Sequence, residues 1–144
     1  MNDNGSEATV DLASLLHTAY GAQAEVESKL SAVGLSMAKL LALRALADAG
    51  EPLPLGQLAD RLSCVKSNIT QLVDRLEADG FVARQADQQD RRTRLAVLTV
   101  AGRKDCKEGL RVQRQTERSL LAGLTKDEAT QLAVLLGKVG GTSS

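Results

Sequence analysis

The stretch from Leu58 to Arg103 constrains the fold more than any other part of this sequence. From Val65 onward, apolar residues recur at helical spacing and form one stripe that a core can bury, namely Ile69, Leu72, Val73 and Leu76. Gly80 follows at the position where a helix end favours a left-handed residue. Residues 81–86 and 93–100 then alternate in polarity around the polar letters DQQDRR, which predicts a β-hairpin with a charged tip.

The predicted helix has a polar face opposite its apolar stripe. At about 100° per residue, this face and its flanks carry the candidate DNA-reading residues Lys66, Ser67, Asn68, Thr70, Gln71 and Arg75, together with Asp74. Side chains that donate and accept hydrogen bonds suit a helix that lies in the major groove and reads base edges. The pattern therefore predicts a recognition helix.

The hairpin that follows carries three arginines within four positions, Arg91, Arg92 and Arg94. An arginine cluster taken alone is usually a solvated surface. Its place on a hairpin directly after a candidate recognition helix instead favours a wing that contacts phosphates or enters the minor groove.

Several segments are similar, in this order and spacing, to those of a known family. They are LSMAKLLALRALADAG, QLADRLSCVKSNITQLVDRLEADGFVAR and DQQDRRTRLAVLTVAGR, with a long predicted helix at each end. Together they resemble the MarR family of bacterial winged helix-turn-helix transcription regulators, over roughly residues 11–139. The resemblance implies a mainly α fold with a small β-hairpin wing, in which N- and C-terminal dimerisation helices flank a winged helix-turn-helix.

Local signals mark where the other elements begin. The expected helix caps are Thr9 or Asp11, then Ser36, Thr99 and a capping box at residues 125–128. The connector EPLPLG, residues 51–56, contains two prolines and can add a short strand beside the hairpin. Residues 55–62 are expected to form the first helix of the helix-turn-helix.

These elements divide the chain of 144 residues into three segments of one intertwined domain. Residues 1–34 are expected to form the N-terminal dimerisation helix, residues 35–100 the winged helix-turn-helix, and residues 101–144 the C-terminal dimerisation helices. The periodicity of the first helix fits packing within its own chain comparably well. It is the resemblance that favours a dimer.

The net charge of the chain is zero, but its charged residues are unevenly distributed. Residues 1–60 hold 3 Lys or Arg and 8 Asp or Glu, a net charge of −5, whereas residues 61–118 hold 13 and 8, a net charge of +5. The basic excess therefore falls on the segment with the predicted recognition helix and wing. Attraction to DNA phosphates requires a local basic face rather than a basic protein, so the distribution favours a nucleic-acid partner.

The resemblance also implies roles for individual wing residues. In the family, a wing aspartate commonly pairs with an arginine that maintains the shape of the hairpin, while another arginine at the tip enters the minor groove. Transferred to this sequence, Asp90 and Arg94 form the structural pair, and either Arg91 or Arg92 lies at the tip. A minor-groove arginine is favoured where the groove is narrow and its potential strongly negative.

The cysteines and the single histidine offer few alternatives. Cys64 and Cys106 are too far apart for a metal-binding spacing, so neither a metal nor another cofactor is expected. His17 is expected to be an ordinary, partly buried residue. Cys64 directly precedes the recognition helix, whose N-terminal dipole would lower the pKa of its thiol, which makes it a candidate redox site. The alternative is that Cys64 is a small residue that fills the turn.

These features predict a sequence-specific DNA-binding transcriptional regulator and not an enzyme, because no catalytic motif is present. The resemblance implies a repressor that binds a pseudo-palindromic operator as a homodimer and is released by a small-molecule effector. Two alternatives remain, a regulator that senses oxidation through Cys64 and a winged-helix protein-interaction module that does not bind DNA. The sequence shows neither an apolar run of about 18 residues nor a basic and apolar leader, so we expect a cytoplasmic protein without a membrane partner.

Overall fold

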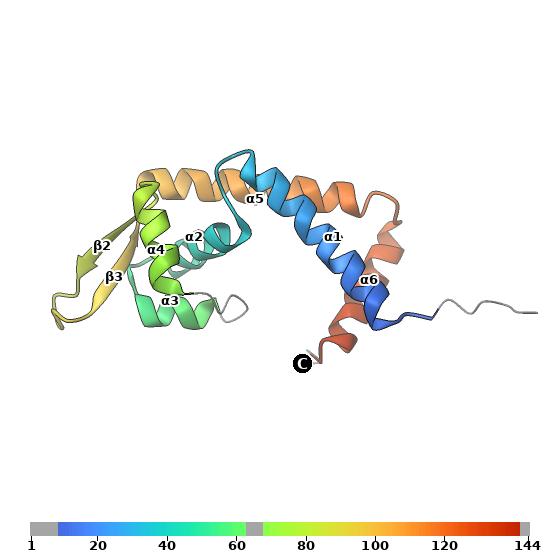
Figure 1. The fold of residues 1–144 in the computed structure, drawn as a ribbon, viewed down its shortest axis with the longest axis horizontal. Coiled ribbons are helices and arrows are strands. Elements are labelled where there is room, and N and C mark those ends of the chain that lie inside the picture. The colour runs from blue at the N-terminus through green and yellow to red at the C-terminus, as the bar shows by residue number, and fades with distance from the viewer. Residues whose placement is uncertain (1–8, 63–67, 142–144) are drawn as a thin grey trace, which may run out of the picture.

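The structure of the chain is a computed structural model that describes residues 9–62 and 68–141. In this part of the chain, helices dominate and one small antiparallel sheet is present (Figure 1). The elements in chain order are α1 (Leu12–Ser31), α2 (Met37–Ala49), β1 (Leu53–Pro54), α3 (Leu55–Arg61), α4 (Ile69–Ala78), β2 (Val82–Ala86), β3 (Arg94–Leu98), α5 (Val100–Leu120) and α6 (Lys126–Val139). The prediction of a mainly α fold with a small β-hairpin is confirmed.

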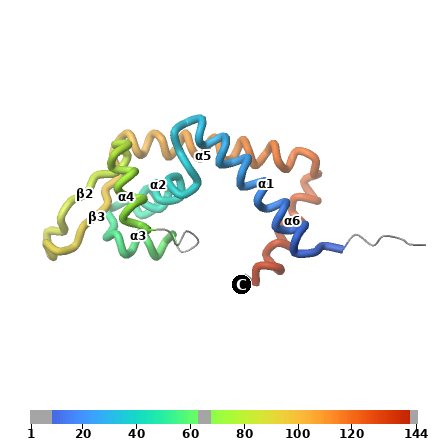
Figure 2. The backbone as a smooth tube through the Cα atoms, viewed as in Figure 1, coloured from blue at the N-terminus to red at the C-terminus, as the bar shows by residue number. Residues whose placement is uncertain are grey.

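Helix α5 connects the two ends of the molecule (Figures 1 and 2). The hairpin of β2 and β3 lies at one end together with α3 and α4, and α6 lies at the other end. Helices α1 and α2 both pack against α5. Helix α5 therefore joins the winged helix-turn-helix to the terminal helices.

Predicted side-chain caps begin four of the helices, at Asp11, Ser36, Thr99 and Thr125. Of the two candidates for the first helix, Asp11 rather than Thr9 is the cap, and its Oδ1 accepts the N–H of Ser14 at 2.7 Å. Glu128 closes the predicted capping box by accepting the N–H of Thr125 at 3.0 Å. These hydrogen bonds lower the pKa of the Asp11 and Glu128 carboxyl groups. The negative charge of each group also interacts favourably with the helix N-terminus.

The three strands form an antiparallel sheet in the order β1-β3-β2. The short strand predicted in the proline-containing connector is present as β1, in which Leu53 lies opposite Ala96 of β3. On the other side of β3, Arg84 of β2 lies opposite the same Ala96. Residues directly opposite each other in an antiparallel pair project to the same face. Because Ala96 is buried, Arg84 projects to the face of the sheet that the helices cover.

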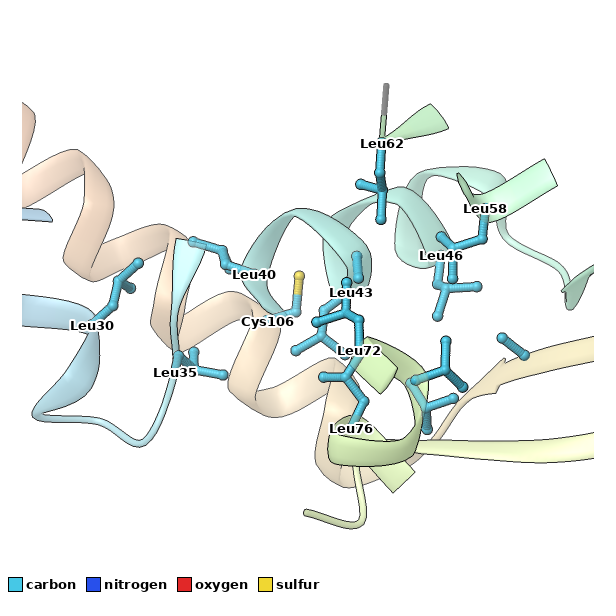
Figure 3. Close-up of a cluster of buried hydrophobic side chains, with 14 of the residues drawn as sticks. Leu30, Leu35, Leu40, Leu43, Leu46, Leu58, Leu62, Leu72, Leu76 and Cys106 are labelled. Atoms are coloured by element: carbon cyan, nitrogen blue, oxygen red, sulfur yellow. The ribbon is translucent and has the colours of Figure 1, made fainter. Parts of the chain in front are cut away.

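The core lies mainly within the winged helix-turn-helix, extends to α1 and α5, and consists almost entirely of aliphatic side chains (Figure 3). Its largest fully buried members are Leu30, Leu40, Leu43, Leu53, Leu58, Leu76 and Val73. Cys106 of α5 belongs to the same buried cluster. Each buried leucine contributes roughly 1.5–3 kcal/mol, so this cluster holds α2, α3, α4 and α5 in one arrangement.

The start of α5 is attached to the turn between α4 and β2. Thr99 donates its hydroxyl to the Gly80 carbonyl at 2.7 Å and its backbone N–H to the Phe81 carbonyl at 3.1 Å. Gly102, in the first turn of α5, is buried, and a Cβ atom at this position would overlap the Phe81 carbonyl oxygen. The absence of a side chain at Gly102 therefore permits the close approach of α5 to the base of the hairpin.

We expect Gly102→Ala to lower the free energy of unfolding by about 1–3 kcal/mol, because the added methyl group overpacks against backbone that cannot move away. In an unobstructed helix the same change would stabilise the fold by about 1 kcal/mol, so the sign of the effect is diagnostic. Gly56→Ala in α3 is the control, since nothing lies within 4 Å of a Cβ atom there. Urea unfolding followed by circular dichroism measures both variants. Unchanged or increased stability of Gly102→Ala would contradict the observed packing.

Helix α6 and the N-terminal half of α1 lie outside the core. No residue of α6 is buried, and its large apolar residues are exposed, namely Leu132, Val134, Leu135, Leu136 and Val139. Leu12, Leu16 and Tyr20 of α1 are exposed as well. Despite this apolar surface, none of the described helices is long and apolar enough to cross a membrane.

His17 lies in this exposed part of α1 and is itself exposed, so the expectation of a partly buried residue is wrong. The buried residues of α1 are Val26 and Leu30, in the C-terminal half of the helix. The N-terminal half of α1 holds no buried residue in the described part of the single chain, so His17 is accessible there.

Candidate nucleic-acid interface

The recognition helix α4 begins at Ile69. The prediction of a continuous helix from Val65 is wrong, because the backbone of Asn68 (φ −44°, ψ 100°) is not helical. Asn68 instead caps α4, and its Oδ1 accepts the N–H of Gln71 at 3.4 Å. Apolar periodicity does not reveal such a cap, because the capping bond leaves the spacing of the buried residues unchanged. Three residues of interest lie outside the described residues: Cys64, Lys66 and Ser67.

The two sides of α4 are arranged as the sequence predicts. The side facing the core buries Leu72, Val73 and Leu76. The exposed candidate DNA-reading residues are Asn68, Thr70, Gln71 and Arg75. The polar groups of these four side chains are therefore accessible to a ligand.

The C-terminal end of α4 is held by α2. Lys39 Nζ lies 2.7 Å from Asp79 Oδ2, and both side chains are largely shielded from solvent. Gly80 follows with a left-handed φ of 79°, so the chain turns into β2 as predicted. This ion pair and the core contacts together hold the recognition helix in place relative to α2.

The hairpin tip is held by hydrogen bonds within its own turn. Asp90 accepts the N–H of Arg92 and the hydroxyl of Thr93, both at 3.1 Å. The N–H of Thr93 in turn donates to the Asp90 carbonyl at 3.0 Å. The Asp90–Arg94 ion pair that the resemblance implies is not formed among the described residues. The physical reason is that the short Asp90 side chain bends back onto the following backbone, as aspartate commonly does in turns.

Arg91, Arg92 and Arg94 are all exposed on the hairpin. In the part of the chain that the structure describes, none of the three forms an ion pair. The described residues therefore do not neutralise these charges, and each guanidinium is available for the charge-assisted hydrogen bonds that arginine makes with phosphate.

Arg84 is a functional candidate that the sequence did not place among the predicted site residues. Its guanidinium lies 2.5 Å from Asp74 and 3.3 Å from Glu77, both on α4, and donates to the Thr70 carbonyl at 3.3 Å. The hydrogen bond with Asp74 raises the pKa of Arg84 above its usual value. The sequence does carry a signal for this role, because Arg84 alternates in phase with the apolar Val82 and therefore shares the buried face of the strand.

Cys106 is buried and unpaired within the core. Burial raises the pKa of its thiol, which disfavours the reactive thiolate. No cluster of His, Cys, Asp or Glu that could hold a metal ion occurs among the residues that the structure describes.

Cys106 is expected to react with iodoacetamide only when the chain unfolds. Peptide mass spectrometry resolves Cys106 from Cys64, and the Cys106 peptide should remain unmodified in native buffer and become fully modified in denaturant. Because burial raises the folded-state pKa, raising the pH through the pKa of the unfolded thiol, about 8.5, should lower stability. Rapid modification of Cys106 in the native protein would contradict its burial.

Comparison with known proteins connects this geometry to a family. The model of the MarR family matches residues 35–93, which run from the residue before the cap of α2 to the residue before β3. The HTH-type transcriptional repressor Rv2887 of Mycobacterium tuberculosis is 31% identical over 116 residues, which cover 81% of this chain and 83% of that protein. The chain belongs to the MarR family.

Other members extend the comparison for this MarR-family chain. The HTH-type regulator YkoM of Bacillus subtilis is 36% identical over 89 residues, which cover 62% of this chain but 58% of YkoM, less than two thirds of its length. The structure of a mutant E. coli MarR complexed with operator DNA is 27% identical with a TM-score of 0.76, covering 89% of this chain and 92% of that one. The structure of Bordetella bronchiseptica BpsR is described for regulation of its DNA binding by 6-hydroxynicotinic acid. It is 26% identical with a TM-score of 0.76, and the match covers 97% of this chain and 98% of that one.

These relatives are transcriptional regulators and not enzymes. The MarR-family chain has the fold of the winged helix-turn-helix class, with the recognition helix and hairpin in the predicted order. It is accordingly a transcriptional regulator of a class that acts on DNA.

Proposed function

We propose that this MarR-family protein is a repressor that binds a pseudo-palindromic operator as a homodimer. One α4 and one wing enter each half-site, and the two half-sites lie one helical turn, about 34 Å, apart. The observation that carries the proposal is the combination of an exposed polar side of α4 with exposed wing arginines at the same end of the molecule, which pair with no acidic group among the described residues (Figure 1).

The two elements have different tasks in this proposal. Helix α4 and the residues just before it read base edges in the major groove, where amide and guanidinium groups make specific contacts. The residues assigned to this task are Lys66, Ser67, Asn68, Thr70, Gln71 and Arg75. The wing binds the DNA backbone and the minor groove through Arg91, Arg92 and Arg94. Asp90 contributes indirectly, because its hydrogen bonds to Arg92 and Thr93 shape the tip that carries these arginines.

Homodimerisation is supported by the apolar surface that one chain leaves open. Leu12, Leu16 and Tyr20 recur every four residues on one side of α1, and α6 exposes the apolar side chains described above. Contiguous apolar surface of this kind is typical of protein interfaces. We assign residues 1–34 and 101–144 to the dimer contact and residues 35–100 to DNA binding.

A small-molecule effector can act on the link between the dimer contact and α4. Glu27 of α1 accepts the N–H of Met37, the first residue of α2, at 3.0 Å. Lys39, in the same turn of α2, pairs with Asp79 at the end of α4. A ligand that favours a different position of α1 would lower DNA affinity by shifting the population toward a spacing that does not fit the operator. The effect of 6-hydroxynicotinic acid on BpsR supports this kind of control.

Selection from a pool of random duplexes tests the proposal with the full chain. We expect the recovered sequences to contain two inverted half-sites with their centres one helical turn apart, and light scattering to give the mass of two chains. Fluorescence anisotropy on the selected duplex should show affinity that falls steeply with salt. Expression of a reporter behind the selected site should decrease when the protein is produced.

Failure of the selection to enrich any sequence would overturn the DNA-binding proposal. Enrichment of a single, unrepeated site would overturn the symmetric homodimer. An increase in reporter expression would replace repression with activation.

A further inference from the structure

The carboxylates of the recognition helix are compensated by cations from other elements. The acidic residues of α4, Asp74 and Glu77, both pair with Arg84 of β2. Asp79, at the end of the helix, pairs with Lys39 of α2. Arg75, by contrast, is exposed and forms no ion pair within the described ranges 9–62 and 68–141. Helix α4 therefore presents an uncompensated positive charge, while its negative charges are paired.

Arg84 directs several hydrogen bonds at α4. Nη2 lies 2.5 Å from Asp74 Oδ1 and donates to the Thr70 carbonyl at 3.3 Å, and Nη1 donates to Glu77 Oε1 at 3.3 Å. The backbone N–H of Arg84 also donates to Glu77 Oε2, at 3.2 Å. We call these contacts the Arg84 clamp. A planar guanidinium can make such bonds to several acceptors at once, so a single side chain joins the hairpin to the recognition helix.

The Arg84 clamp also changes the charge that α4 presents to DNA. Helix α4 contains two carboxylates, Asp74 and Glu77, and one cation, Arg75, so on its own it has a net negative charge. The two carboxylates remain 56% and 44% exposed. Without Arg84 they would stand uncompensated on the element that approaches DNA phosphates, where like charges repel.

We propose that Arg84 is a positioning residue for DNA recognition, which holds the wing and α4 in one relative arrangement and neutralises Asp74 and Glu77 without contacting DNA. The inference rests on the proposed function, because it concerns an operator that α4 and the wing bind together. The clamp has a consequence that simple charge repulsion would not give. Removing the negative charges of α4 should weaken the preference for the operator, although it also removes repulsion from the DNA phosphates.

The deciding variant is Asp74→Asn/Glu77→Gln, which removes two negative charges from α4 and retains Arg84. Affinity is measured by fluorescence anisotropy on the duplex selected by the wild-type protein and on a scrambled duplex of the same length. We expect the ratio of these affinities to fall about tenfold, as expected for loss of a partly shielded ion-pair network. Affinity for the scrambled duplex should rise, because the variant carries more positive charge. Equal increases in both affinities would show that the carboxylates only repel DNA and would overturn the proposal.

Substitutions at Arg84 test the same clamp from the hairpin side. Arg84→Gln should reduce the affinity ratio by a similar factor, and Arg84→Lys should not restore it, because lysine lacks the planar fork. Arg75→Gln is the matched control for a residue that contacts DNA directly, because loss of a cation from the interface makes the salt slope shallower. A salt slope for Arg84→Gln that changes as it does for Arg75→Gln would assign Arg84 to DNA contact and contradict a positioning role.

The combined variant provides an independent readout. When Arg84→Gln is added to Asp74→Asn/Glu77→Gln, the clamp predicts little further loss of the affinity ratio, because both changes break the same interactions. Additive losses would contradict the clamp. If Arg84→Gln does not fold, as judged by thermal unfolding, the carboxylate variant still decides, since its substitutions are isosteric and partly exposed. A wild-type protein that selects no duplex would refute the proposed function, whereas unchanged affinity ratios in variants of a binding protein would refute the clamp alone.

Discussion

Replacing Arg91 and Arg92 together with alanine is expected to lower operator affinity about a hundredfold per protomer, since each hydrogen bond to a charged group contributes about 1.5 kcal/mol. The reason is that both side chains are exposed on the hairpin and unpaired within the described part of the chain. The salt slope should become shallower by about 0.9 for each phosphate that the variant no longer binds. Anisotropy titrations of the selected duplex at several salt concentrations measure both quantities.

A matched control for this variant is Lys29→Ala/Arg44→Ala. It removes the same number of positive charges from exposed pairs with Glu25 and Asp48, far from the hairpin in the chain. Such surface pairs contribute about 0–1 kcal/mol, so the control should bind DNA nearly as the wild type does. Equal reductions of affinity in both variants would attribute the effect to net charge rather than to the wing. Undiminished binding by the wing variant would show that the role assigned to the wing is wrong.

The single variants identify which arginine lies in the minor groove. Narrow A·T-rich minor grooves attract inserted arginine more strongly than wider grooves do. We therefore expect only one of Arg91→Ala and Arg92→Ala to abolish the preference for A·T-rich sequence beside the half-sites. That comparison distinguishes the tip residue from its neighbour, which the sequence leaves open.

Leu135→Glu/Leu136→Glu on α6 is expected to prevent dimerisation and with it operator binding. In the single chain these side chains are 56% and 51% exposed, so a protein that works alone would tolerate the change within about 0.5 kcal/mol. A dimer that covers them would have to bury two charged groups without partners, which costs several kcal/mol. Light scattering should therefore give the mass of one chain, and affinity for the selected duplex should be abolished.

The control for α6 is Lys126→Gln/Thr130→Glu. It makes the same change in net charge but on the side of the helix away from Leu135 and Leu136, given about 100° of rotation per residue. This control should remain dimeric and bind DNA. A dimeric Leu135→Glu/Leu136→Glu variant would show that the exposed face of α6 does not form the interface.

Local interactions account for what could be predicted from the sequence. Helix starts follow from caps that satisfy a backbone N–H three residues away, and these are correct at Asp11, Ser36, Thr99 and Thr125. The left-handed Gly80 and the alternation of the two hairpin strands are equally local signals, and both are confirmed. The buried stripe of α4 follows from helical periodicity alone. Even the incorrect prediction for the start of α4 has a local reason, since Asn68 is the N-cap and the helix therefore begins at Ile69.

The sequence by itself thus determined the order of the elements, most of their ends and the side of α4 that is buried. The tertiary structure alone decided which charged groups meet. Lys39 and Asp79 are 40 positions apart, yet they lie 2.7 Å from each other. Arg84 joins the hairpin to α4, while Asp90 bonds within its own turn and not to Arg94. The physical reason is that exposed charges have many partners of similar energy along a chain, and one becomes favoured only after the buried core has placed the backbones that carry them.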